Sequence, residues 1–113
     1  MNKIRFSEII DRMRHVAQVE DMPISGIFMY LAEEVGEVAV SINVQNGHKR
    51  RKVKETYQEE CVDVMLNALR LILHDGQWTK DDILDYMNKK LIVWEDKIIP
   101  NEREENGTSK VVG

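Results

Sequence analysis

The sequence predicts an all-α protein, in which each protomer resembles a four-helix bundle that oligomerisation completes. Apolar residues recur at three- and four-residue spacing in four separate segments, and no segment alternates apolar with polar residues as a strand does. Only 2 prolines and 6 glycines interrupt the 113 residues, so long helices are possible. With 42% apolar and 32% charged residues, the composition excludes a wholly disordered chain and a membrane-embedded one.

The first two helices are predicted on either side of a break near Pro23. The first has an apolar face with helical spacing, and Ser7 is its expected N-cap. This face consists of Phe6, Ile9, Ile10, Met13 and Ala17. The second helix is expected over about residues 25–41, before the turn signal Asn46-Gly47. Its apolar face consists of Ile27, Leu31, Val35, Val38 and Ile42.

Two further helices follow. The third is expected over about residues 54–74 and ends at Asp75-Gly76, a common C-terminal signal. The fourth begins after Thr79, an expected N-cap followed by acidic residues, and stops before Pro100. We therefore expect one helical domain over residues 1–100 and a polar, mobile tail over residues 101–113.

Charge and cysteine content exclude several classes of protein. The net charge of −4 argues against a protein that coats nucleic acid. Cys61 is the only cysteine, so an intramolecular disulfide and a cysteine-based zinc site are both impossible. The start lacks the apolar region of a signal peptide, and no apolar run reaches the ~18 residues of a membrane helix. We expect a cytoplasmic protein that binds neither nucleic acid nor membrane.

The predicted third helix keeps its polar residues in one sector. At about 100° per residue it is apolar around most of its circumference, and the remaining ~100° is polar. The polar sector contains Glu59, Arg70, Asp63, His74, Asn67 and Glu60. A helix of this kind belongs inside a bundle or an oligomer. The polar sector is then either the one edge that meets water or a surface that faces the neighbouring helix.

Acidic residues on the second helix favour a metal site. Glu34 and Glu37 on one helix and Glu60 and Asp63 on the next form two i,i+3 pairs beside apolar faces, and Glu33 continues the line. Carboxylates that meet across two helices repel by on the order of 4 kcal/mol per close pair at an effective dielectric near 20. A cation that neutralises them makes such clustering tolerable. Oxygen-only ligands suit Mg²⁺ or Mn²⁺ better than zinc or copper.

The acidic residues also carry a resemblance. Glu33-Glu34-Val35-Gly36-Glu37 and Glu60-Cys61-Val62-Asp63 resemble the EExxE…ExxD signature of MazG-like nucleotide pyrophosphohydrolases, over about residues 5–98. This all-α superfamily includes dimeric dUTPases, dCTP pyrophosphatases and phosphoribosyl-ATP pyrophosphohydrolases. The resemblance implies that Glu34, Glu37, Glu60 and Asp63 bind Mg²⁺. It places Glu33 near the metal, and Glu33 or Glu34 would orient or deprotonate the attacking water.

Substrate contacts are expected on the third and fourth helices. Many members carry a K-x-x-x-N-x-x-R pattern that helps to hold phosphates, and the matching positions here are Lys90, Trp94 and Lys97. Lysine at the last position lacks the bidentate fork of arginine. Asn67 lies one turn after Asp63 and is either a contact to sugar or base or a satisfied polar residue of the bundle.

The expected function is Mg²⁺-dependent hydrolysis of a nucleoside triphosphate between the α and β phosphates, which cleans nucleotide pools. Two alternatives stay open: a superfamily member specific for dUTP, dCTP or a phosphoribosyl nucleotide, and a non-catalytic helical binding module. A ferritin-like di-iron site needs Glu-x-x-His pairs, which this sequence lacks. Because the third helix exposes more apolar surface than three other helices can cover, we also expect a homo-oligomer, a dimer or a dimer of dimers.

Overall fold

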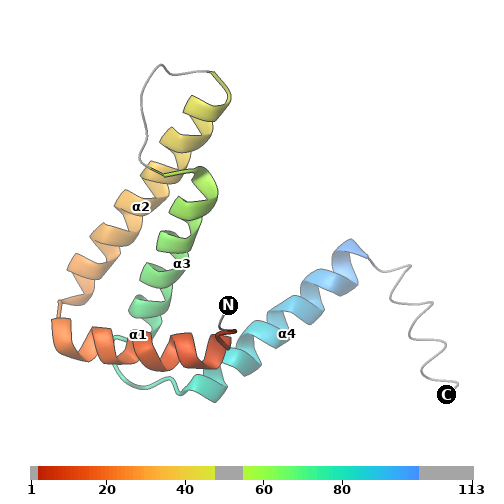
Figure 1. The fold of residues 1–113 in the computed structure, drawn as a ribbon. Coiled ribbons are helices and arrows are strands. Elements are labelled where there is room, and N and C mark those ends of the chain that lie inside the picture. The colour runs from red at the N-terminus through yellow and green to blue at the C-terminus, as the bar shows by residue number, and fades with distance from the viewer. Residues whose placement is uncertain (1–2, 48–54, 100–113) are drawn as a thin grey trace, which may run out of the picture. The chain divides into compact units, whose positions relative to one another are not determined.

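The computed structural model describes residues 3–47 and 55–99, and these residues are almost entirely helical (Figure 1). The four helices are α1 (Phe6–Glu20), α2 (Ile24–Gln45), α3 (Tyr57–Leu73) and α4 (Lys80–Ile98). They hold 81% of the described residues, among which there is no strand. The predicted all-α class with four helices is confirmed. The predicted tail over residues 101–113 lies outside the described residues.

The chain divides into two compact units, Met1–Trp78 and Thr79–Gly113. In the first unit, α2 and α3 lie side by side and run in opposite directions, and α1 packs against α3 (Figure 1). The buried apolar residues of these three helices are Ile10, Ile27, Leu69 and Leu73. The second unit contains α4. Any candidate site built from α2 and α3 therefore lies within the first unit.

The ends of α1 and α2 follow from backbone geometry. Arg5 is the N-cap of α1 and makes no capping bond with its side chain, whereas Ser7 lies inside the helix. The expected Ser7 cap is therefore wrong, because the helix begins one residue before it. At the other end Asp21 adopts a left-handed conformation with φ of 35°, and Pro23 precedes the first residue of α2. A three-residue connection, residues 21–23, thus joins α1 to α2.

Side-chain caps define where α3 and α4 begin. Thr56 accepts a hydrogen bond from the Glu59 backbone N–H, and the Glu59 carboxylate accepts one from the Thr56 backbone N–H at 2.9 Å. Thr79 and Asp82 form the same reciprocal pair at the start of α4, as the predicted Thr79 cap requires. The capping box at Thr56 fixes the first turn of α3, which carries Glu60.

Among the described residues, no helix is long and apolar enough to cross a bilayer.

Candidate metal centre

Four of the six residues in the polar sector of α3 are buried or half-buried, whereas Glu59 and His74 are exposed, and an apolar side of α3 faces outward. Glu60 and Arg70 are each only 8% exposed, and Asp63 and Asn67 are half-buried. On the other side of the helix, Met65 is 59% exposed. The interpretation in which the polar sector is the water-facing edge is therefore wrong for the residues nearest α2 and α1. Carboxylates meet across the helix pair instead.

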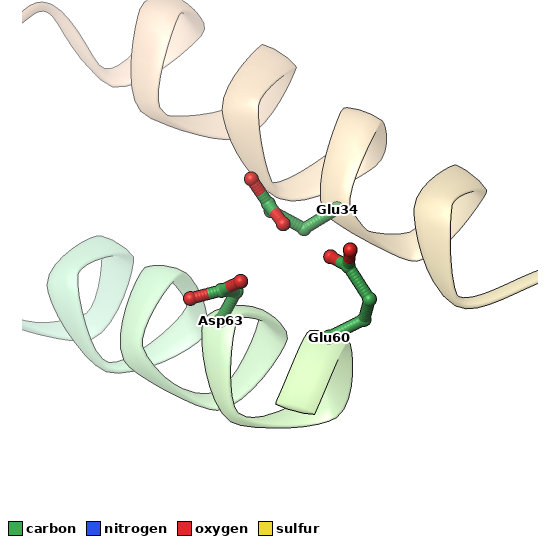
Figure 2. Close-up of side chains that lie close together, drawn as sticks. All are labelled: Glu34, Glu60 and Asp63. Atoms are coloured by element: carbon green, nitrogen blue, oxygen red, sulfur yellow. The ribbon is translucent and has the colours of Figure 1, made fainter. Parts of the chain in front are cut away.

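Three carboxylates converge between α2 and α3 (Figure 2). Glu34 comes from α2, and Glu60 and Asp63 come from successive turns of α3. One oxygen of each lies within 4.8 Å of the others, and the three carboxylates point toward a common space. Glu34 and Asp63 are half-buried and Glu60 is buried. This group of Glu34, Glu60 and Asp63 is called the acidic cluster below.

The surroundings of Glu34 and Glu60 in the acidic cluster disfavour the ionised form of their carboxyl groups. Burial is the main cause of the raised pKa of Glu34, and the negative charges of Asp63, Glu55 and Glu37 add to it. Burial is also the main cause of the raised pKa of Glu60, followed by the charge of Glu34 and a hydrogen bond between these two carboxyl groups. Both residues therefore hold a proton more readily than an exposed glutamate does.

Glu55 is an additional acid beside the cluster that sequence reasoning missed. Its pKa is raised, first by the charge of Asp63, and a hydrogen bond between the two carboxyl groups contributes as well. The Ser41 hydroxyl of α2 donates to the Glu55 backbone carbonyl at 3.3 Å, which ties this residue to the second helix. Glu55 precedes the N-cap of α3, so helical periodicity carries no signal for it. The only sequence signal is its place one residue before the capping box.

The two remaining acids of the predicted signature lie on the exposed part of α2. Glu37 follows Glu34 by one turn, and its charge raises the pKa of both Glu34 and Glu60. It lies outside the acidic cluster itself, since only three of the four predicted ligands have oxygens within 4.8 Å of one another. Glu33 is exposed. The structure thus brings together Glu34, Glu60 and Asp63, with Glu37 near enough to influence them.

Asn67 and Arg70 continue the polar sector of α3 beyond the cluster. The Asn67 side-chain amide donates to the Asp63 backbone carbonyl at 2.9 Å, a bond within the helix. Arg70 Nη2 lies 3.0 Å from Glu20 Oε2 of α1, and within the described residues Arg70 Nε has no hydrogen-bond partner. The Arg70–Glu20 ion pair joins α3 to α1, and it leaves the acidic cluster without a neutralising cation from this arginine.

The other predicted substrate contacts lie on α4 of the second unit. Lys90, Trp94 and Lys97 are all exposed, and Lys90 and Lys97 are separated by seven residues on one side of the helix.

A cavity of about 320 Å³ lies where α2 ends and α3 begins. It is lined by Ser41, Val44, Gln45, Glu55, Thr56, Tyr57 and Glu59. Glu55 belongs to the wall of this cavity and also influences Asp63, so the cavity adjoins the acidic cluster.

The donor set fits a hard divalent cation. The acidic cluster offers three carboxylate oxygens from two helices, and it contains no nitrogen or sulfur donor that would favour zinc or copper. A cation placed among them would offset both the burial and the mutual repulsion that raise their pKa values. Comparison of the chain with protein families, with curated proteins and with solved structures finds no match.

Proposed function

We propose that the protein is a Mg²⁺-dependent nucleoside triphosphate pyrophosphohydrolase that releases a nucleoside monophosphate and pyrophosphate. The observation that carries the proposal is the convergence of Glu34, Glu60 and Asp63 within 4.8 Å across two antiparallel helices. These three residues are among the five acidic positions of this chain that match the EExxE…ExxD pattern, the others being Glu33 and Glu37. The substrate and the bond that is cleaved come from the resemblance, because acidic ligands alone suit many reactions of phosphate.

The chain's own residues have distinct roles in this proposal. Glu34, Glu60 and Asp63 hold the cation, and Glu37 and Glu55 add negative charge around it. When bound, Mg²⁺ screens the charge on the phosphate oxygens and lowers the pKa of a coordinated water. Glu33, one residue before Glu34 and exposed, orients the attacking water or accepts its proton; Glu34 is the alternative base. Asn67, Lys90, Trp94 and Lys97 remain the proposed substrate contacts.

The decisive test is a panel of ribo- and deoxyribonucleoside triphosphates, incubated with the full chain with and without Mg²⁺. Pyrophosphate is expected as a product with Mg²⁺ and is expected to be lost in Glu60→Gln. Glu8→Gln, an exposed glutamate on α1, is the matched control and is expected to retain activity. Selective turnover of dUTP or dCTP would identify a specialised member of the superfamily.

Failure would have a clear form. If no nucleotide gives metal-dependent pyrophosphate, the enzymatic proposal is wrong, and a non-catalytic helical binding module becomes the better interpretation. Equal activity of Glu60→Gln and the wild type would remove the acidic cluster from the reaction.

The proposal also includes a homo-oligomer, a dimer or a dimer of dimers, in the cytoplasm. It is supported by exposed apolar side chains on α2 and α3 and by a single cysteine, which is compatible with a reducing compartment.

A further inference from the structure

The cavity where α2 ends and α3 begins has no part in the proposed metal centre. It meets the acidic cluster at Glu55, which lines the cavity and whose carboxyl group forms a hydrogen bond with that of Asp63. Its volume of about 320 Å³ lies at the lower end of the range of small-molecule sites. This volume suits a ring system of the size of a nucleobase. A nucleotide whose phosphates lie at the acidic cluster would therefore find room for its base next to them.

Two contacts fix the wall between the cavity and the cluster. Ser41 of α2 is only 3% exposed, and its hydroxyl donates to the Glu55 backbone carbonyl at 3.3 Å. The next residue, Thr56, is the N-cap of α3 and forms the capping box with Glu59. The backbone of Glu55 is thus held against α2 on one side and against the first turn of α3 on the other. A wall that the fold positions in this way is typical of a binding site that exists before its ligand arrives.

The wall offers hydrogen-bond acceptors and an aromatic ring. Thr56 and Glu59 are engaged in the capping box. The side chains that a bound molecule would contact are therefore the Glu55 carboxyl group, the Gln45 amide and the ring of Tyr57. The seven residues that line the cavity, all in the described part of the chain, include two carboxylates and no cationic side chain.

This chemistry disfavours phosphate and favours a base that carries an amino group. A phosphate beside Glu55 and Glu59 would meet charges of its own sign. A carboxylate instead accepts hydrogen bonds from an exocyclic amino group, as in contacts between Glu or Asp and N4 of cytosine. Uracil and thymine carry a carbonyl in place of this amino group, so two acceptors would face each other. The ring of Tyr57 supplies a surface on which a base can stack.

We infer that this cavity binds the nucleobase of the substrate and that Glu55 selects bases with an exocyclic amino group. The inference rests on the proposed function, which assigns the phosphates of the same molecule to the acidic cluster. Glu55 is then a specificity-determining residue, separate from the cation-binding residues Glu34, Glu60 and Asp63. Cytosine nucleotides are expected to bind, and uracil nucleotides are expected to be rejected.

The test measures binding of CMP and UMP, so it does not depend on turnover. Each is titrated into the isotope-labelled full chain with Mg²⁺, and the NMR signals of the Gln45 side-chain amide and the Tyr57 ring are followed. CMP is expected to shift both signals and to bind at least about tenfold more tightly than UMP, because UMP leaves the acceptor of Glu55 unpaired.

Three variants connect this preference to the cavity. Glu55→Gln is expected to bring the ratio of the two dissociation constants close to one, because an amide can also donate to the carbonyl of uracil. Glu8→Gln, an exposed glutamate on α1, is the matched control and is expected to keep the wild-type ratio. Val44→Trp fills the cavity and is expected to weaken CMP binding at least about tenfold, and its helical circular dichroism reports whether it folds.

The inference and the proposed function fail in different ways. Equal binding of CMP and UMP to the wild type, or shifts that spare Gln45 and Tyr57, overturns the inference, even where the triphosphate panel gives metal-dependent pyrophosphate. An unchanged preference in Glu55→Gln overturns the role of Glu55. A panel without pyrophosphate contradicts the proposed function, whereas a preference for CMP that Glu55→Gln removes would still support the base site.

Discussion

Glu60 combines two conditions that both disfavour a charged carboxylate. It is 8% exposed, and its nearest charged neighbours include the carboxylates of Glu34 and Asp63. Burial and the neighbouring negative charges both raise the pKa of the Glu60 side chain. In the metal-free protein the ionised form of Glu60 therefore destabilises the fold. A residue that opposes its own environment in this way is typical of a functional site.

The first prediction concerns the replacement Glu60→Gln. The raised pKa means that the folded chain binds more protons than the unfolded chain above the ordinary value of 4.5. The free energy of unfolding of the wild type therefore falls as pH rises through this range. Without metal, Glu60→Gln is expected to be as stable as the wild type or more stable at neutral pH, with an advantage that grows from pH 4.5 upward. Urea unfolding in the presence of a chelator at several pH values measures this.

Glu8→Gln is the control, since this exposed glutamate lies on α1 outside the acidic cluster. It is expected to show no such gain with pH. A Glu60→Gln variant that is less stable than the wild type at neutral pH would contradict the prediction, because the hydrogen bond to Glu34 would then outweigh the repulsion.

The residues that begin α3 also position acids at and beside the acidic cluster. Thr56 and Glu59 cap the helix, Glu55 immediately precedes them, and Glu60 follows within the first turn. A single local structure therefore sets the positions of two acids. The capping box of α4, formed by Thr79 and Asp82, has the same chemistry in the other unit. The two caps offer a matched pair of substitutions.

Thr56→Ala is expected to lower the free energy of unfolding by about 1 kcal/mol, the usual cost of losing an N-cap. It should also reduce the stabilisation by Mg²⁺, because the first turn that carries Glu60 frays. Thr79→Ala removes an equivalent cap, and it is expected to leave the response to Mg²⁺ unchanged. Circular dichroism melts with and without Mg²⁺ compare the variants. An equal loss of the Mg²⁺ response in both variants would show that the effect is not local to the site.

The apolar periodicity of the sequence predicted the four helices, and local start and stop signals predicted roughly where they begin and end. Pro23, Asp75-Gly76 and Thr79 end or begin helices for local reasons, and the structure places the boundaries within a few residues of them. The same periodicity could not show whether the polar sector of α3 contacts another helix or solvent. Most of the polar sector of α3 faces inward, and this depends on how α2 and α1 pack against the helix. Glu55 could not be found, because it lies before the helix and has no period.

At the scale of the whole molecule, the unit that contains α1, α2 and α3 places acidic residues of α2 opposite acidic residues of α3. The motif spacing predicted that carboxylates from two helices would meet, and Glu34, Glu60 and Asp63 do so. The motif spacing could not predict that Glu37 lies outside the acidic cluster. Glu37 follows Glu34 by one turn of α2, and this spacing is the same whether or not the Glu37 side chain reaches the cluster. A cation is the component that would reconcile such a cluster with a stable fold.

Mg²⁺ is therefore expected to raise the melting temperature of the wild type. The folded chain presents the acidic cluster and the unfolded chain does not, so stabilisation follows mass action and reaches about 2.7 kcal/mol at a hundredfold excess over Kd. The effect should shrink as pH falls toward 4.5, and the decline should begin above that value because the pKa values of Glu34 and Glu60 are raised. Melts at matched ionic strength, with KCl replacing MgCl₂, separate binding from screening. Glu60→Gln should lose the shift and Glu8→Gln should keep it; an equal rise in KCl, or a full rise in Glu60→Gln, would mean that Mg²⁺ does not bind at the cluster.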